Sequence, residues 1–306
     1  MKTPTRLGLV LLASLAATAC GTPMVASNML VPGATAGLVN DGAAFARGGS
    51  ITGDVRVIKH VTSRYVDQPR DVWVYLPPGY DKASAHYPVL YMHDGNNIFD
   101  GSQAFGGHEW QADETAERLI KGGELPPLII VGASNTQDRM SEYTWVPGKL
   151  DGKQVGGGGA KYADFLTKEL KPLIDKTYRT KPDRANTGVL GSSLGGLESF
   201  YLGRYNADTF GKIGCMSASI WWSDRAMLKE APKYPRNLKI WLDMGWKEGN
   251  SPDEELANAR DLDKALVARG YKQGGDLGYF EDKEGGHNEQ AWAYRLPLAL
   301  KFLFGT

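Results

Sequence analysis

Short apolar runs alternate with amphipathic stretches along the chain from residue 54 onward. The apolar runs predict strands at residues 55–57, 72–75, 88–92, 128–131, 188–190, 213–216, 238–242 and 277–280. Stretches with helical periodicity predict helices at about residues 110–121, 160–176, 196–205, 253–269 and 289–304. Short apolar strands separated by helices favour a mostly parallel sheet with helices on both faces. Because no repeat or second boundary interrupts this alternation, we predict one α/β domain over residues 53–306.

The first 52 residues have a different pattern. Lys2 and Arg6 precede an apolar run at residues 7–17 that is too short for a membrane-spanning helix, so residues 1–19 are predicted to be an export signal. Residues 15–20 (LAATAC) resemble a bacterial lipobox, in which Cys20 would be lipidated after cleavage. Residues 20–52 are rich in Gly, Ala, Ser and Asn and are predicted to be a flexible tether.

This pattern predicts a lipid-anchored protein of the bacterial cell envelope. Gly21 after the cysteine favours the outer membrane, with the domain exposed to the periplasm. The alternative is a soluble secreted protein in which Cys20 is incidental. The only other cysteine, Cys215, lies in an apolar run and is expected to be buried.

Charge and composition limit the kinds of molecule that this protein is expected to bind. The formal net charge is zero, with 35 basic and 35 acidic residues and no basic stripe, which argues against a nucleic-acid partner. The sequence shows no cluster of His and Cys residues with metal-ligand spacing, and we expect no cofactor.

The clearest chemical motif is G-x-S-x-G, formed by Gly191, Ser193 and Gly195. A predicted strand precedes it and a predicted helix follows, which is the context of a nucleophile elbow. A serine hydroxyl needs a positioned base to become nucleophilic. His287 is the only histidine after Ser193, and it follows two glycines that permit a tight loop. Ser193 is therefore the candidate nucleophile and His287 the candidate base.

The acid of such a site is expected between these two residues, after a strand. Glu248 lies in a Gly-flanked loop after the strand predicted at residues 238–242 and is the preferred candidate. Asp243, at the end of that strand, remains the alternative. Asp253 and Glu254 are better explained as helix-start residues, because Ser251 and Pro252 form a typical N-cap and first helical position.

An oxyanion hole requires backbone N–H groups. One is expected from Leu194, directly after the candidate nucleophile, and one from Asn96, in the polar loop after the strand at residues 88–92. An alternative interpretation of that loop takes His93, Asp94 and Asp100 as metal ligands.

With these residues in place, the chain resembles the bacterial "putative esterase" branch of the α/β hydrolases, which includes feruloyl and siderophore esterases. The resemblance runs from about Arg70 to Phe304 and rests on Arg70 to Tyr80 (RDVWVYLPPGY), Tyr87 to Asp100 (YPVLYMHDGNNIFD), Tyr178-Arg179-Thr180, Gly191 to Gly196, and Gly285-Gly286-His287 followed by Trp292. It implies an α/β-hydrolase fold with Ser193 as nucleophile, His287 as base and Glu248 as acid. It also implies that the oxyanion loop is Asp94-Gly95-Asn96. The chain has Ser217-Ala218-Ser219 where the family usually has Ser-Pro-Ser.

Aromatic residues in loops are candidates for contact with substrate. They are Trp221, Trp222, Trp145, Tyr143 and Trp246, each of which could instead pack beneath a loop. Arg139 and Glu142 are interpreted as a structural pair. The chain is thus expected to be a serine carboxylic-ester hydrolase acting through an acyl-enzyme on a small-molecule or carbohydrate-linked ester, such as a sugar-linked, phenolic or siderophore ester. An acyltransferase with the same residues and a non-catalytic ligand-binding lipoprotein are the alternatives.

Overall fold

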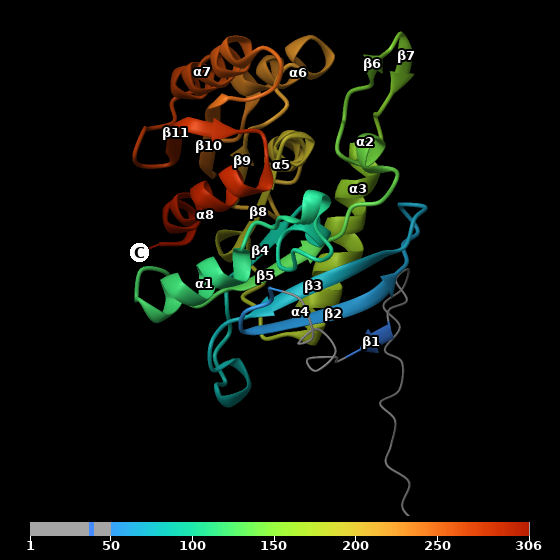
Figure 1. Cartoon of the computed structure of the whole chain (residues 1–306), viewed down its shortest axis with the longest axis vertical. Helices are drawn as coiled ribbons and strands as arrows, with labels where there is room; N and C mark the ends of the chain where they lie inside the picture. Colours follow the sequence, from blue (N-terminus) through green and yellow to red (C-terminus); the bar gives the residue numbers. More distant parts are fainter. Residues whose placement is uncertain (1–36, 40–49, 306) are drawn as a thin grey trace, which may run out of the picture.

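The computed structural model describes residues 37–39 and 50–305 (Figure 1). The predicted signal segment, Cys20 and most of the predicted tether lie outside these residues. Within the described part, no helix is long and apolar enough to cross a membrane.

The centre of the fold is a nine-stranded sheet with the strand order β1-β2-β3-β5-β4-β8-β9-β10-β11. Its strands are β1 (Gly37–Val39), β2 (Asp54–Val61), β3 (Arg70–Leu76), β4 (Val89–Met92), β5 (Ile129–Ala133), β8 (Thr187–Ser192), β9 (Lys212–Met216), β10 (Lys239–Lys247) and β11 (Leu277–Gly286). The pairs from β1 to β5 are antiparallel and those from β5 through β4 to β11 are parallel. The prediction of a mostly parallel sheet is confirmed.

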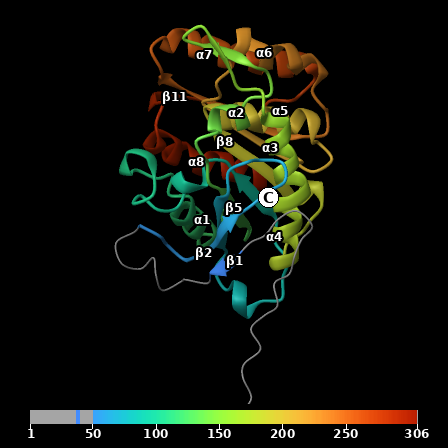
Figure 2. The same ribbon diagram turned by 90° about the vertical axis from the view of Figure 1, so that its right-hand side faces the viewer.

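Helices cover both faces of this sheet, as Figure 2 shows with α1 and α8 on one side and α3 and α4 on the other. The helices are α1 (Ala112–Lys121), α2 (Arg139–Glu142), α3 (Gly159–Phe165), α4 (Lys171–Thr177), α5 (Leu194–Tyr205), α6 (Trp222–Glu230), α7 (Pro252–Arg269) and α8 (Glu289–Phe304). A π-helical turn, η4 (Leu166–Leu170), joins α3 to α4, and 3-10 turns lie at η1 (Tyr80–Lys82), η2 (Gly95–Asn97), η3 (Phe105–Gly107), η5 (Arg184–Asn186) and η6 (Ala231–Lys233).

Side chains alternate along the central strands between two buried clusters. On β5, Ile129 and Val131 belong to the cluster beneath α3 to α7, whereas Ile130 belongs to the cluster beneath α1 and α8. Successive residues of a strand face opposite sides, so a strand buried on both faces is apolar at every position. This is why the sheet strands appear in the sequence as continuous apolar runs.

The observed elements differ from the predicted ones mainly at the C-terminal ends of β10 and β11 and in segments outside the central sheet. Strands β10 and β11 continue past the apolar runs at residues 238–242 and 277–280 and remain paired as far as Lys247 and Gly286. The sequence pattern did not predict α6 or the hairpin of β6 (Gly148–Leu150) and β7 (Lys153–Val155), which projects from the body in Figure 1. Helix α7 begins after Ser251 as expected, but the Ser251 side chain makes no capping hydrogen bond.

Two parts of the predicted tether pack against the domain. Strand β1 pairs antiparallel with β2. Ser50 donates a hydrogen bond to Glu109, and the Thr52 N–H donates to the Asp113 carboxylate at 2.6 Å. Backbone and side-chain hydrogen bonds thus tie residues 37–39 to β2, Ser50 to Glu109, and Thr52 to the first turn of α1.

Candidate active site

Ser193 lies at the sharp turn between β8 and α5, as the elbow motif predicts. Its backbone has φ 57° and ψ −124°, a strained conformation for a residue with a side chain. The turn is held because the Ser193 N–H donates to the Met216 carbonyl at 3.1 Å and the Ser193 carbonyl accepts from the Ser219 N–H at 3.0 Å. A Cβ at Gly191 would lie 2.7 Å from the His93 ring and 2.8 Å from the Gly195 carbonyl, so the first motif glycine is required by packing.

Strands β10 and β11 bring the candidate acid and base together. Lys247 and Gly286 are partners in their parallel register, and Glu248 and His287 are the next residues along each strand. The Nδ1 atom of His287 lies 2.9 Å from Oε2 of Glu248. The long stretch between the two residues forms α7 and β11, which return the chain to the same edge of the sheet.

Asp243, the alternative acid, is fully buried and is held by other groups. It accepts a hydrogen bond from Trp241 Nε1 at 2.7 Å and lies 3.5 Å from Arg295 Nε. Burial raises the pKa of Asp243 to about 6, although the Arg295 guanidinium and the Trp241 hydrogen bond act in the opposite direction. The structure thus places Glu248, and not Asp243, against His287.

The carboxylate oxygen of Glu248 that does not face His287, Oε1, is surrounded by hydrogen-bond donors from the protein interior. Oε1 accepts from the Gly245 N–H at 2.6 Å and from Ser217 Oγ at 2.5 Å, and both terminal nitrogens of Arg295 lie 3.3 Å away. Ser217 Oγ in turn accepts from Trp292 Nε1 at 2.9 Å and from Arg295 Nη2 at 2.7 Å. A hydroxyl can donate one hydrogen bond and accept two, so Ser217 uses all of its capacity here.

Trp292 also supports the base. Its ring meets the His287 ring edge to face, with centroids 5.1 Å apart and an interplanar angle of 83°. Trp292 and Arg295 are three residues apart and share one face of α8, the helix that starts two residues after His287. Sequence reasoning did not assign roles to Ser217 or Arg295. The i, i+3 spacing of Trp292 and Arg295 is the signal from which Arg295 could have been found.

Ser193 and His287 open onto two adjoining hollows of about 510 Å³ and about 490 Å³, and both residues line each of them. Arg139, Asn96 and Trp110 line the first hollow. Glu254, Glu255 and Trp221 are on the wall of the second. A substrate bound at Ser193 can therefore extend in two directions.

The predicted oxyanion residues border the same region. Leu194 is the first residue of α5, and Asn96 lies in η2, where its Oδ1 accepts from the Asn135 N–H at 3.1 Å. This loop sits close to β5, since a Cβ at Gly95 would lie 2.4 Å from the carbonyl carbon and oxygen of Gly132. The assignment of the Asn96 and Leu194 N–H groups to the oxyanion stays a prediction.

The metal interpretation of this loop does not fit the structure. Asp94 is bound by Arg139, with contacts of 2.6 and 2.8 Å, and His93 is buried with its Nδ1 3.4 Å from Tyr162 Oη. Burial lowers the pKa of His93 to about 4, which keeps the ring neutral. The predicted pair of Arg139 and Glu142 is wrong, because Glu142 binds Arg70 instead.

The aromatic candidates separate into exposed and buried residues. Trp221 is 42% exposed and lines the second hollow, whereas its neighbour Trp222 is 2% exposed and donates to the Val146 carbonyl at 2.7 Å. Tyr143 is also buried, and its hydroxyl accepts from the Asp94 N–H at 3.0 Å. Trp145 and Trp246 contact other side chains of the protein. Trp145 stacks on Tyr201 and Tyr205, and the indole N–H of Trp246 donates a hydrogen bond to Glu281. The substrate prediction is therefore corrected for Trp222, Tyr143 and Trp145, which are packing residues.

Known proteins share both the sequence pattern and the fold. The family described as "Putative esterase" matches residues 63–303. An uncharacterized protein of Bacillus subtilis (strain 168), YbbA, is 26% identical over 240 residues, which cover 76% of this chain and 91% of that protein. The ferri-bacillibactin esterase BesA of the same organism is 26% identical over 230 residues, covering 69% and 76%.

Among solved structures, a ferulic acid esterase superposes with a TM-score of 0.63 at 21% identity, covering 82% of this chain and 98% of that one. The fold is thus the one found in esterases, and the family match spans the sheet strands from β3 to β11 together with Ser193, Glu248 and His287. The chain is a member of the "Putative esterase" family of α/β hydrolases and is a carboxylic-ester hydrolase.

Proposed function

We propose that this protein cleaves carboxylic esters through a covalent acyl-enzyme on Ser193, with His287 as general base and Glu248 as the acid that orients it. The observation that carries the proposal is the 2.9 Å contact between His287 Nδ1 and Glu248 Oε2 beside the hollows that Ser193 lines. Ser193 itself occupies the strained turn that exposes a nucleophile in this fold.

In this mechanism Glu248 Oε2 accepts a hydrogen bond from the Nδ1–H of His287, which leaves Nε2 unprotonated and free to take the proton from Ser193 Oγ. Oγ attacks the ester carbonyl carbon, and the N–H groups of Leu194 and Asn96 stabilise the oxyanion. His287 then gives its proton to the departing alcohol. A water molecule, deprotonated by His287, attacks the acyl-enzyme, and the acid product leaves with Ser193 protonated again.

The surroundings of Glu248 suit this role. A buried carboxylate is costly unless donors surround it, and Oε1 has the Gly245 N–H, Ser217 and Arg295. These contacts leave Oε2 to face His287. The carboxylate is thereby fixed in position before a substrate arrives, which is the condition for effective charge stabilisation.

For the substrate, we propose an ester whose acid carries an aromatic ring. Support comes from the exposed indole of Trp221 in the second hollow and from the names of two similar proteins, a ferulic acid esterase and a ferri-bacillibactin esterase. An aromatic acyl group would stack on Trp221 when its carbonyl lies at Ser193.

The test compares the wild type with Ser193→Ala on p-nitrophenyl acetate, a feruloyl ester and a catecholate ester. The variant should fold normally and lose about 10⁴-fold or more in kcat. A fluorophosphonate should label the wild type at Ser193 and leave the variant unlabelled. Full activity in Ser193→Ala would refute the mechanism, and a preference of the wild type for acetyl over aromatic acyl groups would refute the substrate class.

We also propose, on the sequence signal alone, that Cys20 is lipidated and anchors the protein in the cell envelope. Cys20→Ser should move the protein from the membrane fraction to the soluble fraction. An unchanged distribution would contradict the anchor.

A further inference from the structure

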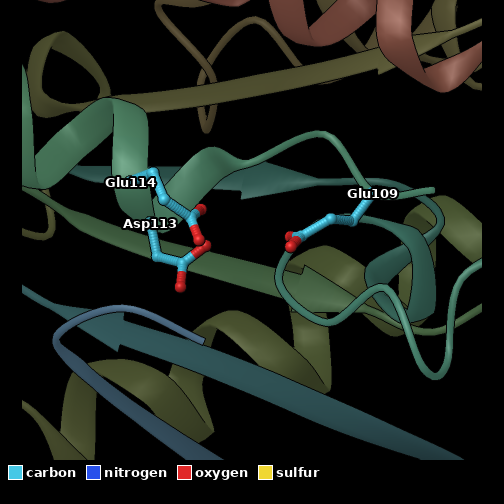
Figure 3. Close-up of side chains that lie close together, drawn as sticks. All are labelled: Glu109, Asp113 and Glu114. Carbon is cyan, nitrogen blue, oxygen red and sulfur yellow. The ribbon is translucent and has the colours of Figure 1, made fainter. Parts of the chain in front are cut away.

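Three carboxylates converge away from Ser193, at the start of α1. Glu109, Asp113 and Glu114 each offer an oxygen within 4.8 Å of the others, and we call them the acidic cluster. Figure 3 shows the carboxylates of Asp113 and Glu114 side by side, with that of Glu109 directed toward them from the preceding loop. Asp113 is 0% exposed and Glu109 is 7% exposed. Repulsion among buried carboxylates makes such an arrangement unfavourable without a compensating charge.

Each carboxylate of the acidic cluster is satisfied on one oxygen only. Ser50 donates to Glu109 Oε1, the Thr52 N–H donates to Asp113 Oδ2 at 2.6 Å, and Thr52 Oγ1 donates to Glu114 Oε1 at 3.2 Å. The remaining oxygens, Glu109 Oε2, Asp113 Oδ1 and Glu114 Oε2, are buried without a hydrogen-bond partner. Within residues 50–305, no basic side chain forms an ion pair with any of the three acids.

We propose that Glu109, Asp113 and Glu114 form a binding site for a divalent cation of the Ca²⁺ class. Ca²⁺ binds oxygen ligands at about 2.4 Å, so two of its ligands lie no more than about 4.8 Å apart, and the oxygens of the acidic cluster lie within 4.8 Å of one another. An all-oxygen set suits Ca²⁺ or Mg²⁺ better than zinc or copper. Glu109 and Glu114 also line a hollow of about 1100 Å³, through which water can complete the coordination shell.

The cation would join segments that are distant in the sequence. It would fix the loop carrying Glu109 to the first turn of α1, while Ser50 and Thr52 hold the same carboxylates from the other side. The loop before Glu109 includes Phe105, and Trp110 follows Glu109 directly; both line a hollow at Ser193. The site is independent of the proposed catalytic role of Ser193.

The experiment uses the full chain after treatment with EDTA. Addition of Ca²⁺ at about 100 times its Kd should raise Tm by about 8 °C, and Tb³⁺ should show luminescence sensitised by tryptophan. Asp113→Asn should abolish both responses. Its Tm in EDTA should equal or exceed that of the wild type, because the amide removes like-charge repulsion. Glu124→Gln, which alters an exposed carboxylate paired with Lys301, should respond as the wild type does.

Two outcomes would overturn the proposal. One is a wild type that shows neither a Tm shift nor Tb³⁺ luminescence. The other is an Asp113→Asn variant that responds to both ions like the wild type. If Asp113→Asn does not fold, Glu114→Gln replaces it with the same expected losses, and retention of the Ca²⁺ and Tb³⁺ responses there would equally refute the site.

Discussion

Ser217→Ala tests the network beneath the proposed catalytic acid. The substitution removes one hydroxyl that donates to Glu248 Oε1 at 2.5 Å and accepts from Trp292 Nε1 at 2.9 Å and Arg295 Nη2 at 2.7 Å. All four residues are buried, so water does not readily replace the lost contacts. The 2.9 Å contact between Glu248 Oε2 and His287 is not touched directly.

The expected loss of stability comes from the two donors, Trp292 Nε1 and Arg295 Nη2, that lose Ser217 Oγ as their acceptor. Trp292 Nε1 loses its acceptor, which costs about 1–3 kcal/mol for a buried group. Arg295 Nη2 keeps Glu248 Oε1 at 3.3 Å and adds less. We expect the free energy of unfolding to fall by about 2 kcal/mol and Tm by about 6 °C. Because Glu248 loses one of its donors but keeps Gly245 and Arg295, kcat should fall about 10-fold, equivalent to about 1.4 kcal/mol, with little change in KM.

Ser217→Gly is the matched variant. Ser217 has φ 42°, in the left-handed region that glycine adopts readily, so the glycine variant should be more stable than the alanine variant while lacking the same hydroxyl. Steady-state kinetics on one ester measure the loss of kcat in both variants. Thermal unfolding measures their loss of stability. Equal losses of kcat support a positioning role for the hydroxyl. Wild-type kcat and Tm in Ser217→Ala, or recovery of kcat in Ser217→Gly, would refute the reasoning.

Three further predictions concern the acid and the oxyanion loop. Glu248→Gln should lower kcat by about 10³-fold or more, whereas Asp243→Asn should cost less than about 10-fold; a large loss only at Asp243 would reverse the assignment. Since the folded-state pKa of Asp243 is raised from 3.8 to about 6, its contribution to stability is present below about pH 4 and is lost as the pH rises through about 6. The difference corresponds to roughly 3 kcal/mol, and denaturant unfolding should show that Asp243→Asn lacks this dependence; an unchanged profile would contradict it. Gly95→Ala places a Cβ 2.4 Å from backbone atoms and should lower both kcat/KM and stability, the latter by about 3 kcal/mol, whereas Gly275→Ala, with its nearest neighbour at 3.4 Å, should change neither.

Local patterns predicted much of the fold and part of the site. The apolar runs identified β4, β5, β8, β9, β10 and β11 because strands buried on both faces are apolar throughout. The G-x-S-x-G motif placed Ser193 at a strand-to-helix turn, which the structure shows. The adjacent Trp221 and Trp222 could not be distinguished, because the sequence pattern predicted no element there from which to infer which side chain is buried.

The sequence by itself determined the order of the apolar strands and the main helices, the elbow at Ser193 and the two residues, Glu248 and Asp243, that compete as acid. Only the tertiary structure shows which of them lies against His287, since this depends on the register that sets Lys247 beside Gly286. It also decided that Arg295, 47 residues beyond Glu248 in the chain, lies beneath that carboxylate. Strand register and helix packing juxtapose residues that are remote in sequence. The pattern of neighbouring residues along the chain does not encode such contacts.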